Sequence, residues 1–314
     1  MKKSIIALAV AGAMTAPMIA QADATLYGRV HERVVVQEDK DVAIQNAGAR
    51  IGVKGNSQMD SGLTSFYQIE LSFGNSARSS NDSTLDSTSL TVRQMNAGVK
   101  GDFGKVIVGR FTNPMTATYV ADIYEQNSGL YEQTPFRIGN AVAYTTPSFN
   151  GLSATLGVIA EGEGSDDTYE DVDGYVARIG GTFGAITVQA AYMDADYTTA
   201  SAADADDLEV ASFGLAYNAN GIYAGLNIES NDSNDEDVVD FALKYTAGKT
   251  AYGFGYAVQE GKGSLEDDRV MVGVYHDLGG SADVYTEIAR HGATDASDVD
   301  TDFNRFTVGY RVKF

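Results

Sequence analysis

The sequence predicts an all-β protein, a 16-stranded antiparallel transmembrane β-barrel. Apolar and polar residues alternate with a period of two along most of the chain, which is typical of strands with one apolar and one polar face. The connections between these segments alternate in length, so that short turns gather at one end and long loops at the other. The composition agrees, because 34 Gly, 18 Tyr and 13 Phe indicate a folded chain rather than a disordered polyelectrolyte.

The first 22 residues predict a secretory signal peptide. Lys2 and Lys3 precede a short apolar run at 5–14, and residues 20–22 (Ala-Gln-Ala) match a small-x-small cleavage site. The apolar run is too short to span a bilayer, and no later run approaches the ~18 residues that a membrane helix needs. We therefore expect an exported chain whose residues 23–314 form one barrel domain, and a helical membrane protein is excluded.

The alternation predicts sixteen strands after the signal peptide. In residues 222–229, for example, the even positions are all apolar and share one face, while the odd positions carry Tyr, Gly, Asn and Glu. The predicted strands are 24–36, 47–56, 62–73, 88–100, 103–110, 137–146, 151–160, 174–183, 185–193, 210–217, 221–229, 238–246, 250–258, 269–276, 281–290 and 303–314.

The connections favour a membrane barrel over a soluble β-sandwich. Short turns are expected at 101–102, 147–150, 183–185, 218–221, 247–249 and 276–280, and long loops at 161–173, 194–209 and 291–302. Membrane barrels of bacteria have short periplasmic turns and long extracellular loops, whereas sandwich connections do not alternate in this way. Aromatic residues near strand ends would form the interfacial girdles; they are Tyr27, Tyr144, Phe149, Phe183, Tyr192, Tyr217, Tyr245, Tyr275 and Phe314.

The charge balance is strongly acidic, with 22 Lys and Arg against 43 Asp and Glu, a formal net charge of −21. Nucleic acid is therefore excluded as a partner, since phosphate binding needs a basic surface. The acids concentrate in the predicted long loops, where Lys40, Arg78 and Lys262 are the only bases, and the strands are modestly basic. The absence of Cys excludes disulfides and thiolate metal sites.

Several segments resemble general porins of Gram-negative outer membranes. They are residues 24–29 (ATLYGR), 49–55 (ARIGVKG) and 101–110 (GDFGKVIVGR), and the resemblance extends over 23–314. The last strand, with Tyr310, Val312 and Phe314, is similar to the family's signal for barrel assembly. The resemblance implies an outer-membrane homotrimer in contact with lipids, lipopolysaccharide and the barrel-assembly machinery. It also implies a water-filled channel for passive transport of ions and small hydrophilic solutes.

The resemblance further implies that the third long loop, residues 111–136, folds into the barrel as a constriction. The loop contains Pro114 and Pro135 near its ends and carries acids but no base. The predicted constriction acids are Asp122, Glu125 and Glu132. The family's usual Pro-Glu-Phe-Gly-Gly tip is absent, since residues 124–129 read YEQNSG.

Opposite this loop, strand parity predicts a basic wall that matches the family's ladder residue by residue: Arg29, Arg50, Arg93 and Arg137. Acids facing arginines produce a transverse field that screens polar solutes. Each arginine alone is also compatible with simple solvation or with pairing to a neighbouring carboxylate. Further candidates for lining the lumen are Lys54, Arg110 and Arg178.

Three polar residues are predicted to face outward and are candidates for a trimer interface: Glu32, Gln94 and Asn96. Polar side chains that face lipid are costly at the bilayer midplane, so these strands are expected to face another subunit. The alternative is a local bulge that shifts the parity.

No enzyme is predicted, because His31, His276 and His291 lie in no catalytic motif and at different levels of the barrel. Residues 298–302 and 232–236 are similar to acidic calcium loops but lack the Gly and Glu of an EF-hand. We expect no cofactor, only loose Ca²⁺ or Mg²⁺ association with acidic loops. The predicted function is a mildly cation-selective general diffusion channel; a substrate-specific channel, for instance for sugars, and a soluble secreted β-rich binding protein are the alternatives.

Overall fold

The computed structural model describes residues 23–73, 90–125, 134–160, 172–197, 206–233, 235–261, 265–293 and 302–314. The predicted signal peptide and Glu132 lie outside these ranges. The elements are β1 (Asp23–Gln37), β2 (Ala43–Asn46), β3 (Arg50–Gln58), β4 (Thr64–Phe73), β5 (Leu90–Gly101), β6 (Gly104–Thr112), the 3₁₀ helix η2 (Pro114–Thr118), β7 (Arg137–Thr145), β8 (Leu152–Ile159), β9 (Gly174–Phe183), β10 (Ile186–Tyr197), β11 (Asp206–Ala219), β12 (Ile222–Asn231), β13 (Glu236–Ala247), β14 (Thr250–Gly261), β15 (Leu265–Gly279), β16 (Ala282–Ala293) and β17 (Phe303–Lys313).

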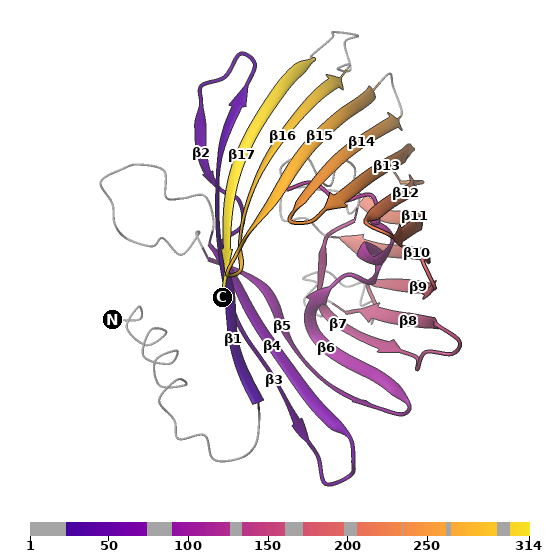
Figure 1. The fold of residues 1–314 in the computed structure, drawn as a ribbon. Coiled ribbons are helices and arrows are strands. Elements are labelled where there is room, and N and C mark those ends of the chain that lie inside the picture. The colour runs from indigo at the N-terminus through magenta and orange to yellow at the C-terminus, as the bar shows by residue number, and fades with distance from the viewer. Residues whose placement is uncertain are drawn as a thin grey trace, which may run out of the picture.

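These strands form one antiparallel sheet that closes into a barrel (Figure 1). From β3 onward each strand pairs with the next along the chain, and β1 closes the circle by pairing with β17 from Arg29↔Lys313 to Gln37↔Arg305. On its other edge β1 pairs with β2 and with β3, which are two halves of one barrel strand. The seventeen-stranded sheet is therefore a 16-stranded barrel, as predicted.

The interruption between β2 and β3 has a local cause. The side-chain Oδ1 of Asn46 accepts hydrogen bonds from the backbone N of Gly48 (2.8 Å) and of Ala49 (2.7 Å), which turns the chain out of the ladder. Gly48 has φ +109°, a conformation that residues with a Cβ rarely adopt. The backbone oxygen of Gly48 then accepts a hydrogen bond from Nε of Arg29 (2.9 Å).

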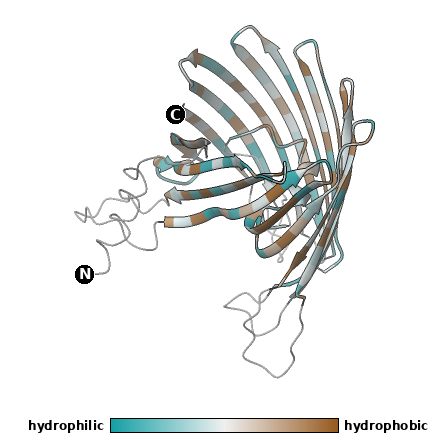
Figure 2. Ribbon diagram, turned by 90° about the horizontal axis from the view of Figure 1, so that it is seen from below, coloured by the Kyte–Doolittle hydropathy of each residue, from teal (hydrophilic) through white to brown (hydrophobic). Residues whose placement is uncertain are grey.

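Apolar side chains lie outside the barrel and polar ones inside. On β17, Phe306, Val308 and Tyr310 are exposed, while Thr307 between them is fully buried. Figure 2 shows the same alternation of hydrophobic and hydrophilic residues along the strands. This distribution is the reverse of a soluble protein and fits a barrel with an apolar lipid-facing surface. Among the described residues, no helix has the length and apolar composition needed to cross a bilayer.

The predicted aromatic girdle is mostly outward. Its exposed members are Tyr144, Phe149, Phe183, Tyr192, Tyr217, Tyr245 and Phe314. The prediction was wrong for Tyr27 and Tyr275, which point inward and donate hydrogen bonds to Glu70 (3.0 Å) and Glu287 (2.8 Å). A tyrosine near a strand end can lie in the outer aromatic girdle or donate a hydrogen bond inside the barrel. Its position along the strand therefore did not show whether it faces the lipid or the lumen.

The C-terminal residue closes the barrel seam. Gly28 N donates to the backbone oxygen of Phe314 (2.9 Å), and Phe314 N donates to the oxygen of Gly28 (3.1 Å). A Cβ at position 28 would clash with the Phe314 ring and with the oxygen of Arg50, so the ring occupies the space that the glycine leaves. The outward faces of Tyr310 and Phe314 continue the apolar surface next to this seam.

The outward orientation predicted for Gln94 and Asn96 was wrong. Glu70 pairs with Gln94 but Leu71 pairs with Val92, so Arg93 is the extra residue of a β-bulge. The bulge turns Gln94 and Asn96 inward, where Gln94 donates to Oγ1 of Thr112 (2.9 Å) and receives a hydrogen bond from Asn96 (3.2 Å). Glu32 keeps its outward parity; it is exposed beside Tyr310 on β17.

Candidate functional site

The third loop begins and ends at one clamp on the barrel wall. Asn113 N donates to the backbone oxygen of Phe136 (2.9 Å), and its side-chain Nδ2 donates to the oxygen of Pro135 (3.0 Å). Its Oδ1 accepts from Met115 N (3.1 Å) and caps η2. These hydrogen bonds hold the two ends of the loop together. The chain that follows Asn113 therefore leaves the sheet and runs inside the barrel.

The first turn of the loop, η2, packs against the inner wall. Met115 is fully buried in a cluster with Phe111, Ile138 and Met193, all of which turn into the barrel. The hydroxyls of Thr118 and Ser212 on β11 are 2.6 Å apart and share a hydrogen bond. Apolar packing and one buried hydrogen bond thus direct the loop along the wall and across β9 to β11.

Glycines on the wall provide the space in which the loop backbone runs. A Cβ at Gly214 on β11 would clash with the backbone oxygen of Thr118, and one at Gly225 on β12 would clash with that of Val120. Tyr223, also on β12, donates its hydroxyl to the oxygen of Val120 (2.5 Å). The loop therefore follows a track of small residues from strand to strand, in backbone contact with the wall.

The track continues to β14 and β15. The ring of Tyr124 fills the space above Gly255, and its hydroxyl donates to the backbone oxygen of Met271 (3.2 Å). Burial, and then the charge of Glu287, raise the pKa of Tyr124 above its usual value, so its phenol stays protonated.

The described part of the loop ends at Glu125, which the wall holds at three points. Its backbone N donates to Oε1 of Glu287 on β16 (2.6 Å), and its backbone oxygen accepts from Nη1 of Arg33 on β1 (3.5 Å). Its carboxylate forms an ion pair with Arg311 on β17. The loop thus crosses from β6 to the seam between β17 and β1, and two of its three predicted acids lie in described residues inside the barrel.

Acids of the loop and bases of the wall line one cavity of 520 Å³, which we name the eyelet cavity. Its lining residues are Arg29, Ala47, Asp122, Ile123, Tyr124, Glu125, Tyr223, Lys244 and Arg311. The predicted Arg29, Asp122 and Glu125 therefore meet at one place. Lys244 and Arg311 were not predicted, although both continue the inward parity of their strands.

The predicted basic wall surrounds a carboxylate that the sequence did not single out. Arg29 and Arg50 are directly opposite each other across β1 and β3. Glu70 on β4 accepts from Nε of Arg93 (2.7 Å), lies 3.7 Å from Nε of Arg50 and accepts from the hydroxyl of Tyr27. Like charges opposite one another are destabilising, so Glu70 offsets the repulsion that the arginines create.

The other predicted lumen residues occupy different positions. Arg137, on β7, lies within electrostatic range of Arg93 and Arg50, and its buried Nε has no hydrogen-bond partner among the described residues. Lys54 points inward, with its ammonium 5.1 Å from the centre of the Tyr27 ring. Arg110 lies at a bulge on β6 and donates to the backbone oxygen of Val92 (3.0 Å).

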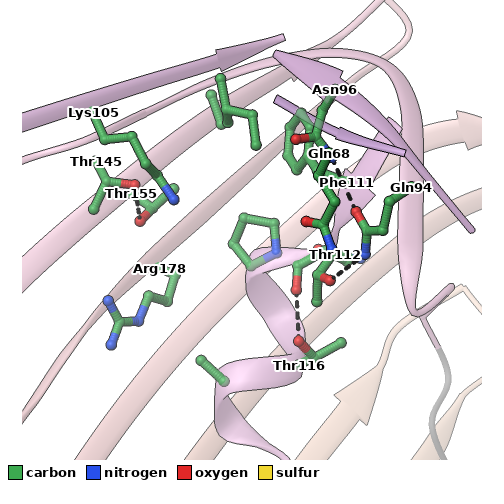
Figure 3. Close-up of a pocket in the computed structure, with 15 residues that line it drawn as sticks. Gln68, Gln94, Asn96, Lys105, Phe111, Thr112, Thr116, Thr145, Thr155 and Arg178 are labelled. Carbon is green, nitrogen blue, oxygen red and sulfur yellow. Dashed lines mark hydrogen bonds between the residues drawn. The ribbon is translucent and has the colours of Figure 1, made fainter. Parts of the chain in front are cut away.

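Arg178 lines a second cavity of 420 Å³, which we name the vestibule cavity. The residues that line it are Gln68, Gln94, Asn96, Lys105, Ile107, Phe111, Thr112, Asn113, Pro114, Thr116, Ala117, Ala143, Thr145, Thr155 and Arg178 (Figure 3). Among the described residues, no three or more His, Asp or Glu side chains lie close enough together to hold a metal ion.

A closed barrel with an inward loop and opposed charges is the geometry of a selective water-filled passage. The sequence profile of Gram-negative porins matches residues 7–296. The chain belongs to the Gram-negative porin family. It is therefore a porin of the bacterial outer membrane and forms a channel for diffusion of small solutes, which confirms the predicted fold, function class and location.

Known porins are similar along nearly the whole chain. Major outer membrane protein P.IB of Neisseria meningitidis serogroup A is 26% identical over 314 residues, covering 88% of this chain and 89% of that protein. Outer membrane porin protein OmpD of Salmonella typhimurium is 29% identical over 251 residues, covering 71% and 68%. The solved anion-selective porin from Comamonas acidovorans has the same fold, with a TM-score of 0.78 at 16% identity over 94% of this chain and 100% of that one.

Proposed function

We propose that ions and small hydrophilic solutes cross this porin by passive diffusion and are screened at the eyelet cavity by size and by a transverse field. The observation that supports this is the opposition of Asp122 and Glu125 on the loop to Arg29, Lys244 and Arg311 on the wall. Polar solutes align their dipoles in such a field, while apolar solutes lose hydration without compensation. Transport of this kind requires no catalysis and no cofactor.

Planar-bilayer recording and liposome swelling test this function. We expect stepwise single-channel conductance that rises with KCl concentration, and uptake of neutral sugars that falls smoothly with their size and does not saturate. Saturable uptake of one neutral sugar, together with inhibition of the ion current by that sugar, would instead identify a substrate-specific channel. A purified protein that stays soluble without detergent and gives no conductance would contradict both.

We also propose a mild preference for cations. The supporting observation is the net charge of −21, because the acidic long loops concentrate cations at the mouth of the channel. The arginines of the wall act in the opposite sense, but Glu70 and Glu125 pair with Arg93 and Arg311 and reduce their effect. Reversal potentials in a KCl gradient measure the preference, and an anion-selective sign would contradict it.

The assembly that we propose is a homotrimer that contacts its neighbours through the face of β1. OmpT of Vibrio cholerae, solved in a trimer form, has a TM-score of 0.70 to this chain at 22% identity over 94% of this chain and 100% of that one. Glu32 is exposed on this face between the exposed Val30 and Val34 of the same strand, where a carboxylate facing lipid would be costly. Chemical crosslinking in detergent should give trimers, and Glu32→Lys should weaken them.

Further partners complete this proposal. The apolar outer surface contacts outer-membrane lipids and lipopolysaccharide, and the last strand, which ends at Phe314, is presented to the barrel-assembly machinery. Ca²⁺ or Mg²⁺ associates loosely between acidic loops and anionic lipid.

A further inference from the structure

A row of four polar side chains lies side by side on neighbouring strands of the vestibule cavity. Lys105 on β6 pairs in register with Thr145 on β7, Thr145 pairs with Thr155 on β8, and Thr155 pairs with Arg178 on β9. All four line the cavity (Figure 3). The row therefore has a cation at each end and two hydroxyls in the middle, and neighbouring strands place its ends about 14 Å apart along the wall.

The two cations have no acidic partners in the described part of the chain. No Asp or Glu is among the residues that line this cavity, and no described carboxylate forms an ion pair with Lys105 or Arg178. This contrasts with Arg311 of the eyelet cavity and with Arg93 of the basic wall, each of which is paired with an acid. In a protein of net charge −21, the vestibule cavity is a region of uncompensated positive charge.

Neutral partners fix Arg178 without reducing its charge. Its Nε donates to Oε1 of Gln189 (2.8 Å), and its Nη1 donates to Oγ of Ser153 (3.0 Å). The hydroxyls of Thr145 and Thr155 are 3.0 Å apart and share a hydrogen bond. A ligand that meets such a group finds it already oriented, which lowers the entropy cost of binding.

The opposite side of the cavity supplies amide and hydroxyl groups. Gln68, Asn96 and Thr112 line it from β4, β5 and β6, and the inward turn of Asn96 is a consequence of the Arg93 bulge. Amides and hydroxyls each donate and accept hydrogen bonds, which suits a solute with several hydroxyl groups. The volume of 420 Å³ falls within the usual range of small-molecule sites, roughly 300–1,000 Å³.

We propose that the vestibule cavity is a binding site for a small polyhydroxylated anion, a monosaccharide that carries a phosphate or a carboxylate. Lys105 and Arg178 bind the anionic group, and the threonines and amides bind the sugar hydroxyls. The site lies toward the end of the barrel with short turns, since Lys105 directly follows the turn between β5 and β6. The vestibule cavity is separate from the eyelet cavity. The proposal rests on the proposed function only because its test requires an open channel.

The test measures block of the KCl current through single channels by glucose 6-phosphate. We expect a saturable decrease in current, with half-saturation in the millimolar range. Glucose alone and inorganic phosphate alone should each need concentrations at least about tenfold higher, because each offers only one of the two kinds of contact. Equal potency of inorganic phosphate would overturn the sugar part of the proposal.

Variants separate this site from the remaining positive charge of the lumen. Lys105→Gln and Arg178→Gln should each raise the half-saturating concentration of glucose 6-phosphate by about tenfold. Lys105→Arg should retain the block, and Lys54→Gln, which removes a lumen cation outside this cavity, is the matched control and should change it less than about twofold.

Lys105 is exposed to the lumen, so its substitution does not disturb packing even if a change at the more buried Arg178 prevents folding. Steps of normal KCl conductance without any block by glucose 6-phosphate, or a block that Lys105→Gln leaves unchanged, would overturn this inference and leave the proposed function intact. Absence of conductance steps would instead contradict the proposed function.

Discussion

Arg311 on β17 forms ion pairs with Glu125 of the third loop and with Asp283 on β16. The distance between Nη2 of Arg311 and Oδ2 of Asp283 is 3.0 Å. One guanidinium therefore joins a fixed acid of the wall to an acid of the loop, next to the seam where β17 meets β1. The same group therefore holds Glu125 of the loop and lies on the strand that closes the barrel.

Replacing Arg311 with Gln should shift ion selectivity toward cations. The change removes one positive charge from the eyelet cavity, and it also removes a charged hydrogen bond to Glu125, which contributes about 1.5–3 kcal/mol. We expect more variable open-channel current, because Glu125 is less firmly held. Glu125→Gln removes the opposite charge and should shift selectivity toward anions. Single-channel recording and reversal potentials in a KCl gradient measure both effects.

Arg290→Gln is the matched control for these variants. The ion pair of Arg290 with Asp302 is more exposed to solvent, with 58% and 35% of the two side chains accessible, and exposed pairs contribute about 0–1 kcal/mol. A shift of the same sign for Arg311→Gln and Glu125→Gln would show that charge at the eyelet does not set the selectivity.

Replacing Arg50 or Arg93 with Gln should change conductance and move selectivity toward cations, while the trimer stays intact. Each change removes a lumen charge near the constriction and leaves Glu70 with one arginine instead of two. Bilayer recording checks the current, and electrophoresis of unheated samples checks the trimer. Unchanged conductance and selectivity in both variants would mean that this part of the wall does not lie at the constriction.

Glu70→Gln should have the opposite electrical effect and a larger effect on stability. The arginines then lose the charge that offsets their repulsion, so we expect a shift toward anions and a loss of about 1–3 kcal/mol in the free energy of unfolding. Denaturant unfolding in detergent micelles measures the stability. Stability equal to that of the unchanged protein would show that solvent in the lumen screens these charges effectively.

The alternation of the sequence was sufficient to predict the barrel. Successive side chains of a strand point to opposite faces, and every side chain on the lipid-facing side is favoured to be apolar. The prediction failed where the period was broken. The bulge at Arg93 moved Gln94 and Asn96 to the inner face. The strand predicted at 47–56 begins only at Arg50, and β2 (Ala43–Asn46) precedes it in a segment for which no strand was predicted. Neither has a signature in composition alone, since both depend on backbone conformation.

The sequence predicted that acids and bases line the candidate site, but it predicted only some of the residues that do so. The residues Arg29, Asp122 and Glu125 line one cavity, but Glu70 and Arg311 were missed because their role depends on which strands become neighbours when the barrel closes. The glycine track was also missed. Gly214 and Gly225 appeared to be ordinary strand glycines, and only the path of the loop explains why a side chain is excluded there.

Gly225→Ala should displace the third loop. The new Cβ would clash with the backbone oxygen of Val120, and backbone cannot yield as the end of a flexible side chain does. We expect the hydrogen bond from Tyr223 to Val120 to be lost, the single-channel conductance to change, and stability to fall by about 1–3 kcal/mol, as in other overpacked sites.

Gly139→Ala on β7 is the control for this substitution, since a Cβ there would meet only the side chain of Arg110. It should leave conductance within experimental error. If Gly225→Ala and Gly139→Ala behave alike in both conductance and unfolding, the loop is not in backbone contact with β12.

Deletion of Phe314 should impair folding more than Phe314→Ala does. The alanine variant keeps both backbone hydrogen bonds with Gly28 and loses only a ring that is 60% exposed. The deletion loses those hydrogen bonds as well, each contributing about 0.5–1.5 kcal/mol, at the point where β1 and β17 close the barrel. Phe314→Tyr retains ring and backbone and should fold normally. Refolding yield in detergent, read as the fraction of heat-modifiable barrel, should therefore rank Tyr above Ala above deletion; equal yields for alanine and deletion would show that the ring alone carries the effect.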